Sequence, residues 1–498
     1  MPGPPVIEVL GDPALPAQVD VVVVGGGIVG TSAALELVDQ GLSVALCEKG
    51  GIGHEQSSRN WGWVRAGDRD ERELPLMMHA LDLWDSMHQR TGRDVGFVRS
   101  GITFAIHSAQ EAAHLERWRK AASEHGVVAE MLTEAALAHA FPNAPKTGFG
   151  AMVTPLDGRA EPQKAAPSIA EAVRAKGGHI LTACAARGFE TTAGRVSAVV
   201  TERGPIACEA AVIAGGAWSK LLCRQQGLRF PQLNILNAVV RTEPLAGGPE
   251  GAFWSEDFAF RKRQDGGYTI ANGSANIVDL VPDSLRYGLQ FNDLIRANRA
   301  SMKLRLGRQF LAEIPMMWRA DLDRLGPFER TRVLDPRPSK RFTVDLLRQL
   351  GEQWPFFAQA TIAQAWAGYI DMTPDEIPVI SPLDAVPGLF LASGFSGHGF
   401  GLGPGAGRLA ADLVTGNTPI VDPTPIWRWR SMPSTTCWMG SEPEPCFGPE
   451  SYFVTVPGLV ASCRCAASRG QLGWAFRWGT VAETAPEKHD MTPPPQPQ

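Results

Sequence analysis

Short apolar runs separated by glycines divide the first fifty residues into a strand, a helix and a second strand. Residues 19–24 read VDVVVV, and a run that is apolar on both faces is typical of a strand buried between two layers. Residues 31–40 then place apolar side chains on one helical face, and Gly41 ends this predicted helix. Residues 43–48, SVALCE, form the second apolar run. The pattern therefore predicts a β-α-β unit of a parallel sheet.

The rest of the chain alternates between helical and strand patterns. Helices are predicted over 109–125, 163–176, 292–313 and 343–350. Strands are predicted within 95–108, 179–213 and 233–275, with a hairpin around Asp265-Gly266-Gly267. Near the end, a short strand at 389–392 leads into a glycine-dense loop, and a helix follows with Ala406, Leu409, Ala410 and Leu413 on its apolar face.

Composition places the chain among ordinary globular proteins and excludes several classes. Its 498 residues, 44% apolar and 20% charged, predict two lobes with sizeable cores. The net charge of −5 comes without a basic stripe, which argues against a nucleic-acid partner. No apolar run approaches the roughly 18 residues needed to cross a bilayer, and residues 1–18 do not resemble a secretory signal, so we expect a cytoplasmic protein.

The cysteines do not indicate a metal site. Cys47, Cys184, Cys208 and Cys223 lie in apolar surroundings and are predicted to be buried free thiols. There is no CxxC pair and no His/Cys spacing that suits zinc. We therefore expect no metal.

Three glycines between the first strand and the first helix have the spacing of a dinucleotide-binding turn. In Gly25-x-Gly27-x-x-Gly30, the first glycine permits the tight turn, the second lets the backbone approach a pyrophosphate, and the third lets helix and strand pack closely. The helix N-terminus offers free N–H groups to the phosphates. Glu48, at the end of the second strand, can accept hydrogen bonds from ribose hydroxyls and disfavours a 2′-phosphate, so NADP is not expected.

A second strand, glycine loop and helix within 389–415 favour a flavin over a nicotinamide cofactor. Nicotinamide dehydrogenases do not ordinarily return to such an element near the end of the chain. A bound flavin needs one because its ring and its pyrophosphate both require close backbone approach and fixed N–H donors.

Four motifs in this order resemble the D-amino-acid oxidase superfamily of FAD enzymes, especially its sarcosine oxidase and glycine oxidase branch. They are the first glycine turn, AAVIAGGAWSKLL (210–222), WAGYIDMTPDEIPVI (366–380) and SGFSGHGFGLGPGAG (393–407). The resemblance implies FAD-dependent oxidation of the C–N bond of a small amino acid or secondary amine, with hydride transfer to the flavin and oxygen or another electron acceptor. Residues 366–380 contain no cysteine and residues 57–63 no histidine, so noncovalent FAD is expected.

The resemblance also implies an α/β fold in which a Rossmann-like FAD-binding domain of the glutathione-reductase type is discontinuous and holds an inserted α+β substrate domain. The FAD-binding parts are expected at 18–90, 151–230 and 363–426, the substrate parts at 91–150 and 231–362, and a short lead at 1–17. Residues 427–498 extend past the end of family members without a sustained period. Their composition resembles out-of-frame translation of GC-rich coding sequence, and we expect them to be disordered; a small interaction module is the alternative.

The residues expected to hold FAD come from both glycine elements and from the segments beside them. They are Gly25, Gly27, Ile28, Val29, Gly30, Glu48, Lys49, Ser58, Arg59, Asn60, Gly215, Gly394, Gly397, His398, Gly399, Phe400 and Gly401.

Three basic residues are the candidates for the chemistry. Arg65 matches by position an arginine that holds the substrate carboxylate in sarcosine oxidase relatives, a task that suits a planar guanidinium; a structural ion pair is the alternative. His398 is expected beside the flavin, where it could polarise the ring or influence the protonation of the amine, or be purely structural. Relatives carry a lysine where this chain has Gly401, so another cation must share the carboxylate or the substrate differs. Arg261 and Arg263 are the candidates, and the alternative is that both lie on the solvated face of their strand.

Several alternatives stay open at this point. Trp61 and Trp63 are expected in the core in preference to a substrate cage. The protein could instead be a flavin-binding subunit of a larger dehydrogenase, a catalytically disabled homologue, or an FAD monooxygenase, which fits the first glycine motif but not the last. D-amino acids, N-methyl amino acids and cyclic imino acids all carry a carboxylate beside an amine, and the sequence does not rank them.

Overall fold

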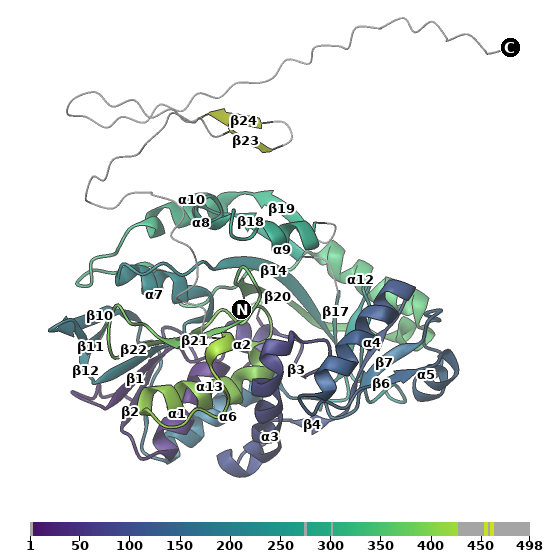
Figure 1. Ribbon diagram of the computed structural model, residues 1–498, viewed down its shortest axis with the longest axis horizontal. Helices are drawn as coiled ribbons and strands as arrows, with labels where there is room; N and C mark the ends of the chain where they lie inside the picture. The colour runs from purple at the N-terminus through teal and green to yellow at the C-terminus, as the bar shows by residue number, and fades with distance from the viewer. Residues whose placement is uncertain (1–2, 273–275, 300–301, 427–452, 457–458, 463–498) are drawn as a thin grey trace, which may run out of the picture. The chain divides into compact units, whose positions relative to one another are not determined.

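Strand β1 (Val21–Val24) lies inside a six-stranded sheet in the computed structural model of the chain (Figure 1). Strands follow in the order β21 (Val379–Pro382), β22 (Leu389–Ser393), β13 (Ala210–Ile213), β1, β2 (Val44–Cys47) and β9 (His179–Leu181). All neighbours pair in parallel except β21 and β22. Three separate stretches of the chain supply these strands, in agreement with the predicted discontinuous domain.

The structure describes residues 3–272, 276–299, 302–426, 453–456 and 459–462, which fall into two units that divide after residue 432. In the second unit, β23 (Phe453–Val456) pairs antiparallel with β24 (Leu459–Ser462). The predicted tail thus contains one hairpin, and the expectation of disorder for its other residues lies outside the described part of the chain. No helix in the described ranges is long and apolar enough to cross a membrane.

Alternation along β1 divides the core between the two faces of this sheet. Val21 and Val23 pack with the helices of one face, α1 (Ile28–Asp39), α3 (Leu74–Thr91), α6 (Pro162–Ala175) and α13 (Gly399–Thr415). Val22 and Val24 pack toward the other face with α7 (Ser219–Gln225) and the meander β10 (Ala186–Thr192), β11 (Arg195–Thr201) and β12 (Gly204–Ala207). Both faces are therefore covered, as the all-apolar run predicts.

A second sheet of ten strands forms the other lobe. Its order is β19 (Met302–Leu306), β18 (Asn276–Leu280), β14 (Leu233–Thr242), β17 (Tyr268–Ala271), β16 (Ala259–Lys262), β15 (Ala252–Trp254), β5 (Ile102–Ala105), β7 (Ala151–Thr154) and β6 (Glu130–Leu132), with β20 (Ile362–Met372) paired to β14. The predicted hairpin at 265–267 is present between β16 and β17. A buried aromatic cluster that includes Phe253, Phe260, Trp354 and Phe357 fills one side.

The remaining α-helices and β-strands of the described chain lie outside these two sheets and the meander. They are α2 (Gln56–Arg59), β3 (Trp63–Val64), β4 (Val98–Arg99), α4 (Ala109–Ser123), α5 (Glu134–Ala140), β8 (Gly158–Arg159), α8 (Pro282–Tyr287), α9 (Asn292–Ala297), α10 (Arg308–Glu313), α11 (Pro327–Arg330) and α12 (Lys340–Gln353). The single helix predicted over 292–313 is wrong, because β19 separates α9 from α10. Residues 302–306, MKLRL, alternate apolar and polar side chains, and this period of two forms an edge strand on β18.

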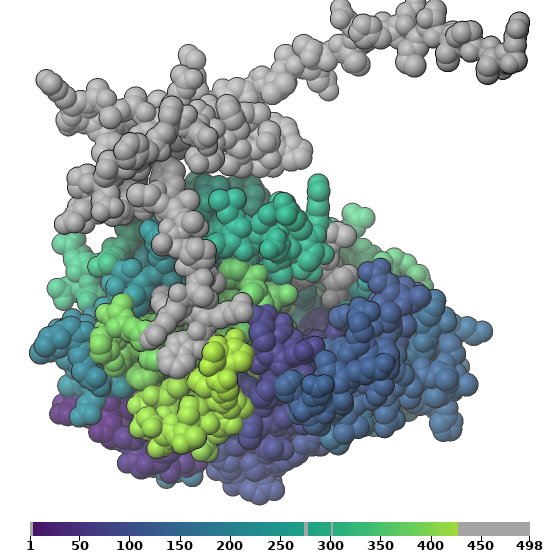
Figure 2. Space-filling view, viewed as in Figure 1, coloured from purple at the N-terminus to yellow at the C-terminus, as the bar shows by residue number. Residues whose placement is uncertain are grey.

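The glycine-dense segment near the end of the chain is mostly helix, not the loop predicted from its composition. Helix α13 begins at Gly399. Its glycines have no side chains, which lets the helix approach its neighbours closely. A Cβ atom at Gly407 would lie 2.5 Å from the backbone nitrogen of Ala33 in α1, and one at Gly405 would lie 3.0 Å from Ala80 in α3. At its far end, the Asn417 amide donates to Gln40 at 3.0 Å, and Figure 2 shows this yellow-green part of the chain at the surface.

Candidate functional site

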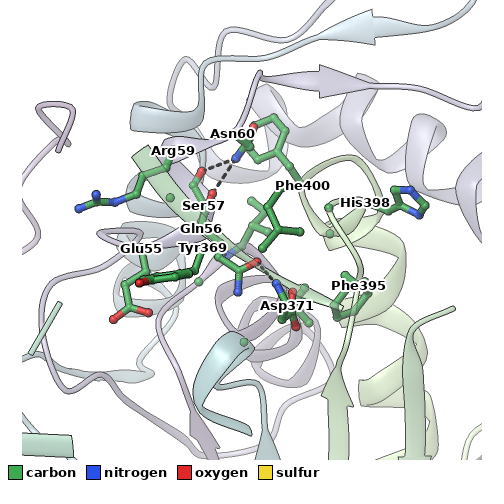
Figure 3. A pocket seen from close by; sticks show the side chains of 18 of the residues that line it. Glu55, Gln56, Ser57, Arg59, Asn60, Tyr369, Asp371, Phe395, His398 and Phe400 are labelled. Atoms are coloured by element: carbon green, nitrogen blue, oxygen red, sulfur yellow. Dashed lines mark hydrogen bonds between the residues drawn. The ribbon is translucent and has the colours of Figure 1, made fainter. Parts of the chain in front are cut away.

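A cavity of about 500 Å³ receives lining residues from both sheets. One end is formed by the turn between β1 and α1 together with Glu48, and the other by residues of β14, β20 and the segment after α2. Figure 3 shows Gln56, Tyr369 and Asp371 gathered at one place in this cavity, whereas the side chains of Arg59 and His398 point away from that place. Side chains from both sheets therefore line the same cavity.

The glycine turn leaves no space for side chains. Gly25 has a φ of +118°, and a Cβ atom there would lie 2.3 Å from the carbonyl oxygen of Ala214. A Cβ atom at Gly30 would lie 2.0 Å from the Gly25 carbonyl oxygen. Gly27, Ile28 and Val29 line the cavity, and the Ile28 N–H donates to the Ser57 hydroxyl at 2.8 Å. This geometry is what the spacing predicts for a turn that brings backbone close to a pyrophosphate.

Glu48 and Lys49 line the cavity but are already held by the protein. The Glu48 carboxylate accepts from the backbone N–H groups of Gly26 and Gly50, both at 2.7 Å, while burial raises its pKa above the ordinary value. The Lys49 ammonium donates to Glu55 at 2.7 Å and lies 4.3 Å from the centre of the Trp218 ring. Glu48 is thus fixed in orientation, and each of its oxygens can still accept a further hydrogen bond.

The segment Ser58-Arg59-Asn60 serves mainly to hold the backbone around the cavity. Arg59 donates to Asp335 at 2.7 Å and to the Ala367 carbonyl at 2.9 Å, and it is buried. The Asn60 amide donates to the Ser57 carbonyl at 2.9 Å and accepts from the Gly62 N–H at 2.7 Å. Arg59 and Asn60 line the cavity, whereas Ser58 is not among its lining residues.

Arg65 and Arg69 bring two guanidinium groups to the other end of the cavity. The Arg65 guanidinium donates to the carbonyl of Gly67 and lies 5.7 Å from the centre of the Phe104 ring. Arg69 is 4% exposed, and its Nε donates to the Arg65 carbonyl at 3.2 Å. Burial lowers the pKa of both, and that of Arg69 falls to about 9, with the charge of Arg65 as the second cause. The two arginines share the cavity lining with the carboxylates of Asp68 and Glu376.

Arg261 and Arg263 do not line the cavity. Arg261 forms a buried bidentate pair with Glu161, at 2.9 and 3.2 Å, and Arg263 donates to Asp265 at 3.1 Å. Both side chains have protein carboxylates within reach. Arg261 and Arg263 are thus absent from the lining of the cavity that Arg65 and Arg69 line.

His398 forms a buried pair with a residue that the sequence did not single out. Its Nδ1 lies 3.1 Å from Glu73 Oε2, and Glu73 is fully buried. Burial, and next the charge of Arg69, lower the pKa of His398 to about 4. Burial opposes the charged form of Glu73, but its hydrogen bond with His398 and the charge of Arg69 favour that form, and the pKa of Glu73 is lowered. The imidazole is uncharged at neutral pH, which leaves Nδ1–H to donate to Glu73.

The remaining predicted residues divide between the cavity wall and the supporting layer. Gly215, Gly397, Gly399 and Phe400 line the cavity with His398, whereas Gly394 and Gly401 lie behind it. The Gly394 N–H donates to Asp371 at 3.0 Å, and the Gly401 carbonyl accepts from Trp84 at 2.8 Å. Burial raises the pKa of Asp371 to about 6.

Sequence reasoning missed Arg69, Glu73 and Asp371. The first two stand in the run GDRDERE, whose charges resemble a solvated turn. A signal was available in the spacing, since Arg69 follows Arg65 by four residues, but burial of the run is visible only after α3 and α4 pack beside it. Trp118 of α4 donates to the Arg69 carbonyl at 2.7 Å.

The residues present fit a dinucleotide that carries a ring system. The glycine turn accepts close approach at one end, Glu48 offers acceptors next to it, and the cavity continues past Gly397 and Phe400 to aromatic and cationic walls. The glycine turn and Glu48 would hold the dinucleotide, and its ring system would lie toward the aromatic and cationic walls.

Comparisons with known proteins agree with this fit. Residues 20–413 match the family DAO, described as FAD dependent oxidoreductase. The solved structure of the L-amino acid deaminase from Proteus vulgaris is 30% identical, with a TM-score of 0.80, and the match covers 85% of this chain and all of that one.

Curated relatives include proteins of different length. Glycine oxidase from Geobacillus kaustophilus is 26% identical over 82% of this chain and 96% of its own length. The 4-methylaminobutanoate oxidase (formaldehyde-forming) from Paenarthrobacter nicotinovorans is 25% identical over 83% of this chain, which spans only 45% of that longer protein.

Proposed function

Because the chain belongs to the DAO family of FAD-dependent oxidoreductases, we propose that it oxidises the C–N bond of an α-amino acid whose carboxylate is bound at Arg65. The family match confirms three predictions from the sequence: membership of the D-amino-acid oxidase superfamily, FAD as the cofactor, and an oxidoreductase as the enzyme class. Noncovalent attachment of FAD and a cytoplasmic location stay predictions.

The observation that carries the proposal is the position of Arg65. Its guanidinium lines the same cavity as the glycine turn and makes hydrogen bonds only to carbonyl oxygens among the described residues. A planar guanidinium binds a carboxylate through two parallel hydrogen bonds, which fixes the position of the α-carbon relative to the flavin. This supports an amino acid as the substrate in preference to a simple amine.

The cavity walls and the relatives narrow the substrate further. Phe104 and Trp254 lie 6.3 Å apart on this side of the cavity, and Trp61 and Trp63 pack edge to face at 5.2 Å. These walls suit an apolar side chain. The similarity to an L-amino acid deaminase favours the L-series, and glycine oxidase among the relatives favours small substrates.

Each residue of the site has a separate task in this proposal. The glycine turn and Glu48 would hold FAD, which would supply a hydride acceptor for the carbon that carries the amine. Arg65 orients the substrate by its carboxylate. Glu73 fixes the tautomer of His398, whose low pKa keeps the imidazole uncharged, so it adds no positive charge beside the amine at neutral pH. The aromatic walls exclude water from the reacting atoms.

The experiment is anaerobic mixing of the FAD-loaded full chain with matched amino acids while the flavin absorbance is followed. The panel contains L-phenylalanine, D-phenylalanine, N-methyl-L-phenylalanine, glycine and, as the control without a carboxylate, L-phenylalanine amide. We expect the L-amino acid to bleach the flavin and the amide to leave it oxidised. Arg65→Met should abolish the bleaching, whereas Arg99→Met, which removes an arginine paired with Asp85 at the surface, should not.

The outcomes separate the proposal from its rivals. Bleaching by the amide as readily as by the acid would contradict the role of Arg65. An FAD-loaded protein that no amine bleaches would favour the flavin-binding subunit or the disabled homologue. Readmission of oxygen then tests the acceptor, because rapid reoxidation identifies an oxidase and slow reoxidation a dehydrogenase.

A further inference from the structure

Glu376 is a carboxylate on the wall of the cavity that has no partner of its own among the described residues. It lies in the turn between β20 and β21 and lines the cavity together with Arg65 and His398. No hydrogen bond or ion pair joins its side chain to the described chain, whereas the adjacent Asp375 pairs with Arg72 at 3.2 Å. Glu376 is half-buried, so accessible surface remains for a ligand.

The other carboxylates of the cavity wall all have donors in contact. They are Glu48 with the Gly26 and Gly50 N–H groups, Glu55 with Lys49, Asp371 with the Gln232 amide and the Gly394 N–H, and Asp68 with His114. Within the described ranges, Glu376 is thus the lining carboxylate whose oxygens stay available to a ligand.

The turn holds Glu376 in a conformation that does not favour a glutamate. Its φ is +61°, a left-handed value that glycine and asparagine adopt more readily. The Glu376 N–H donates to the Thr373 carbonyl at 3.3 Å, and the Thr373 hydroxyl donates to the Ile377 carbonyl at 3.0 Å. The backbone therefore gives no reason for a glutamate at this position, and its side chain has to supply one.

The charges around Glu376 are negative. After burial, the charges of Glu73, Asp375 and Asp70 raise the pKa of Glu376. A positively charged ligand group at this place is attracted by Glu376 and by these neighbours, whereas a neutral group is not.

Arg65 stands in different electrostatic surroundings. The carboxylates that act on its pKa are Asp68, Asp157 and Glu73. Arg65 and Glu376 therefore offer opposite charges at two places on one wall. A ligand that binds both needs a carboxylate and a cation separated by an apolar chain, and aromatic side chains line the same cavity.

We infer that Glu376 binds a positively charged group at the far end of the substrate side chain, so that basic amino acids are preferred over neutral ones of the same length. The inference rests on the proposed function and deepens it, because it names the substrate class and assigns Glu376 as a specificity-determining residue.

The first test is binding of two carboxylate probes that differ only in charge. 4-Amidinobenzoate and its neutral isostere 4-carbamoylbenzoate have no hydrogen on a carbon that carries nitrogen, so neither can be oxidised. Each is titrated into the FAD-loaded full chain, and the perturbation of the flavin spectrum gives its Kd. We expect the wild type to bind the amidine about 10- to 100-fold more tightly, the gain from one charged hydrogen bond, and Glu376→Gln to bind both equally. Glu209→Gln, at an exposed glutamate outside the cavity lining, is the matched control and should keep the wild-type ratio.

The second test compares L-lysine with L-norleucine, which has the same side-chain carbons without the ammonium group. The wild type should show the larger kcat/KM for lysine, and Glu376→Gln should lose this preference while its kcat/KM for norleucine stays near that of the wild type. Equal binding of the two probes by the wild type, or a probe ratio unchanged in Glu376→Gln, would overturn the inference. Because the probes need no turnover, a protein that distinguishes them through Glu376 but oxidises neither amino acid would contradict the proposed function alone.

Discussion

Arg261 and Arg69 are both buried arginines, and their surroundings differ in one respect. Arg261, 1% exposed, has its own carboxylate, since both oxygens of Glu161 accept from its guanidinium. A third hydrogen bond joins it to the Trp61 carbonyl at 2.5 Å. Arg69, 4% exposed, has no comparable partner and keeps one buried N–H unsatisfied. Arg261 faces a completed network, and Arg69 faces the cavity.

The difference shows that two buried guanidinium groups in one protein can be stabilised in different ways. Residue type and burial do not distinguish the two arginines, and both stand in strands or turns near aromatic side chains. What distinguishes them is a direct carboxylate partner: Glu161 accepts from Arg261, whereas Glu73, Asp157 and Asp68 act on Arg69 only through their charges. A variant that removes Glu161 should therefore strongly destabilise the protein, because Arg261 stays buried without its partner. Removal of the Arg69 side chain should destabilise it less.

The largest effect is expected from Glu161→Gln. The substitution keeps the shape of the side chain but leaves Arg261 buried without a carboxylate, which should lower the free energy of unfolding by about 3–5 kcal/mol. Arg261 lowers the pKa of Glu161 despite burial, so the contribution is full above the ordinary glutamate pKa and is lost as pH falls. Urea unfolding at pH 7 measures the change. Glu250→Gln, at an exposed pair with Lys262, is the control and should cost under about 1 kcal/mol. Equal effects would break the comparison.

A smaller effect of opposite sign is expected from Asp371→Asn. Asp371 is a buried carboxylate that accepts from the Gln232 amide and the Gly394 N–H, both at 3.0 Å, without a cation. Its pKa is raised to about 6, so its contribution is most favourable below the unfolded value and is lost as pH rises through 6. The variant should be more stable by about 2–3 kcal/mol at pH 7 and nearly equal at pH 4.

Chemical unfolding of both proteins across this range tests the sign. Asp257→Asn, at an exposed aspartate of the other lobe, is the matched control and should show no such pH dependence. If Asp371→Asn were less stable than the wild type at pH 7, the hydrogen bonds to the ionised carboxylate would outweigh the cost of its burial. Neutral donors would then stabilise a buried charge as well as an opposite charge does.

His398 should produce a pH effect of about 2 kcal/mol. Burial lowers its pKa from 6.5 to about 4, so the folded protein resists protonation. Stability is therefore full above pH 6.5 and falls as pH approaches 4, because the unfolded chain binds the proton more readily. Between pH 8 and 5 the wild type should lose about 2 kcal/mol more than His398→Asn. His107→Asn, at an exposed histidine, should behave like the wild type. No difference between His398→Asn and the wild type would show that Glu73 offsets the cost of burial.

The nucleotide end of the site could be predicted because its signals are local. Gly25, Gly27 and Gly30 lie within six residues of one another. Gly30 is required by a contact with the Gly25 carbonyl and Gly25 by one with Ala214, next to β13, whereas Gly27 lies against Ser57 of α2. The same holds for the buried alternation along β1. The glycines of α13 were misread because their reason is distant: they are small to fit α1 and α3, which lie more than 300 residues earlier in the chain.

The substrate end depends on long-range packing and could be predicted only in part. Arg65 was identified through a family resemblance, and its role stays a prediction. Arg69 and Glu73 become buried only when α4 and α13 pack against the turn. The partner of Arg261 is 100 residues earlier, so no local pattern could show that this arginine is already paired.

The smallest effect is expected from Arg263→Met. This variant tests an arginine that the sequence offered for substrate binding but that the structure pairs with protein groups. Arg263 was a candidate for the substrate carboxylate, but its guanidinium donates to Asp265 at 3.1 Å and to the Thr269 hydroxyl at 3.3 Å. It lies 3.8 Å from Glu161, which Arg261 alone can still neutralise. Asp265 is 44% exposed at its side chain, so water replaces the lost donor there and the variant should lose only about 1 kcal/mol of stability. Its kcat/KM for the best amino acid of the panel should stay near that of the wild type, in contrast to Arg65→Met. A large fall in kcat/KM with stability unchanged would return Arg263 to the site and show that a paired arginine can still serve the substrate.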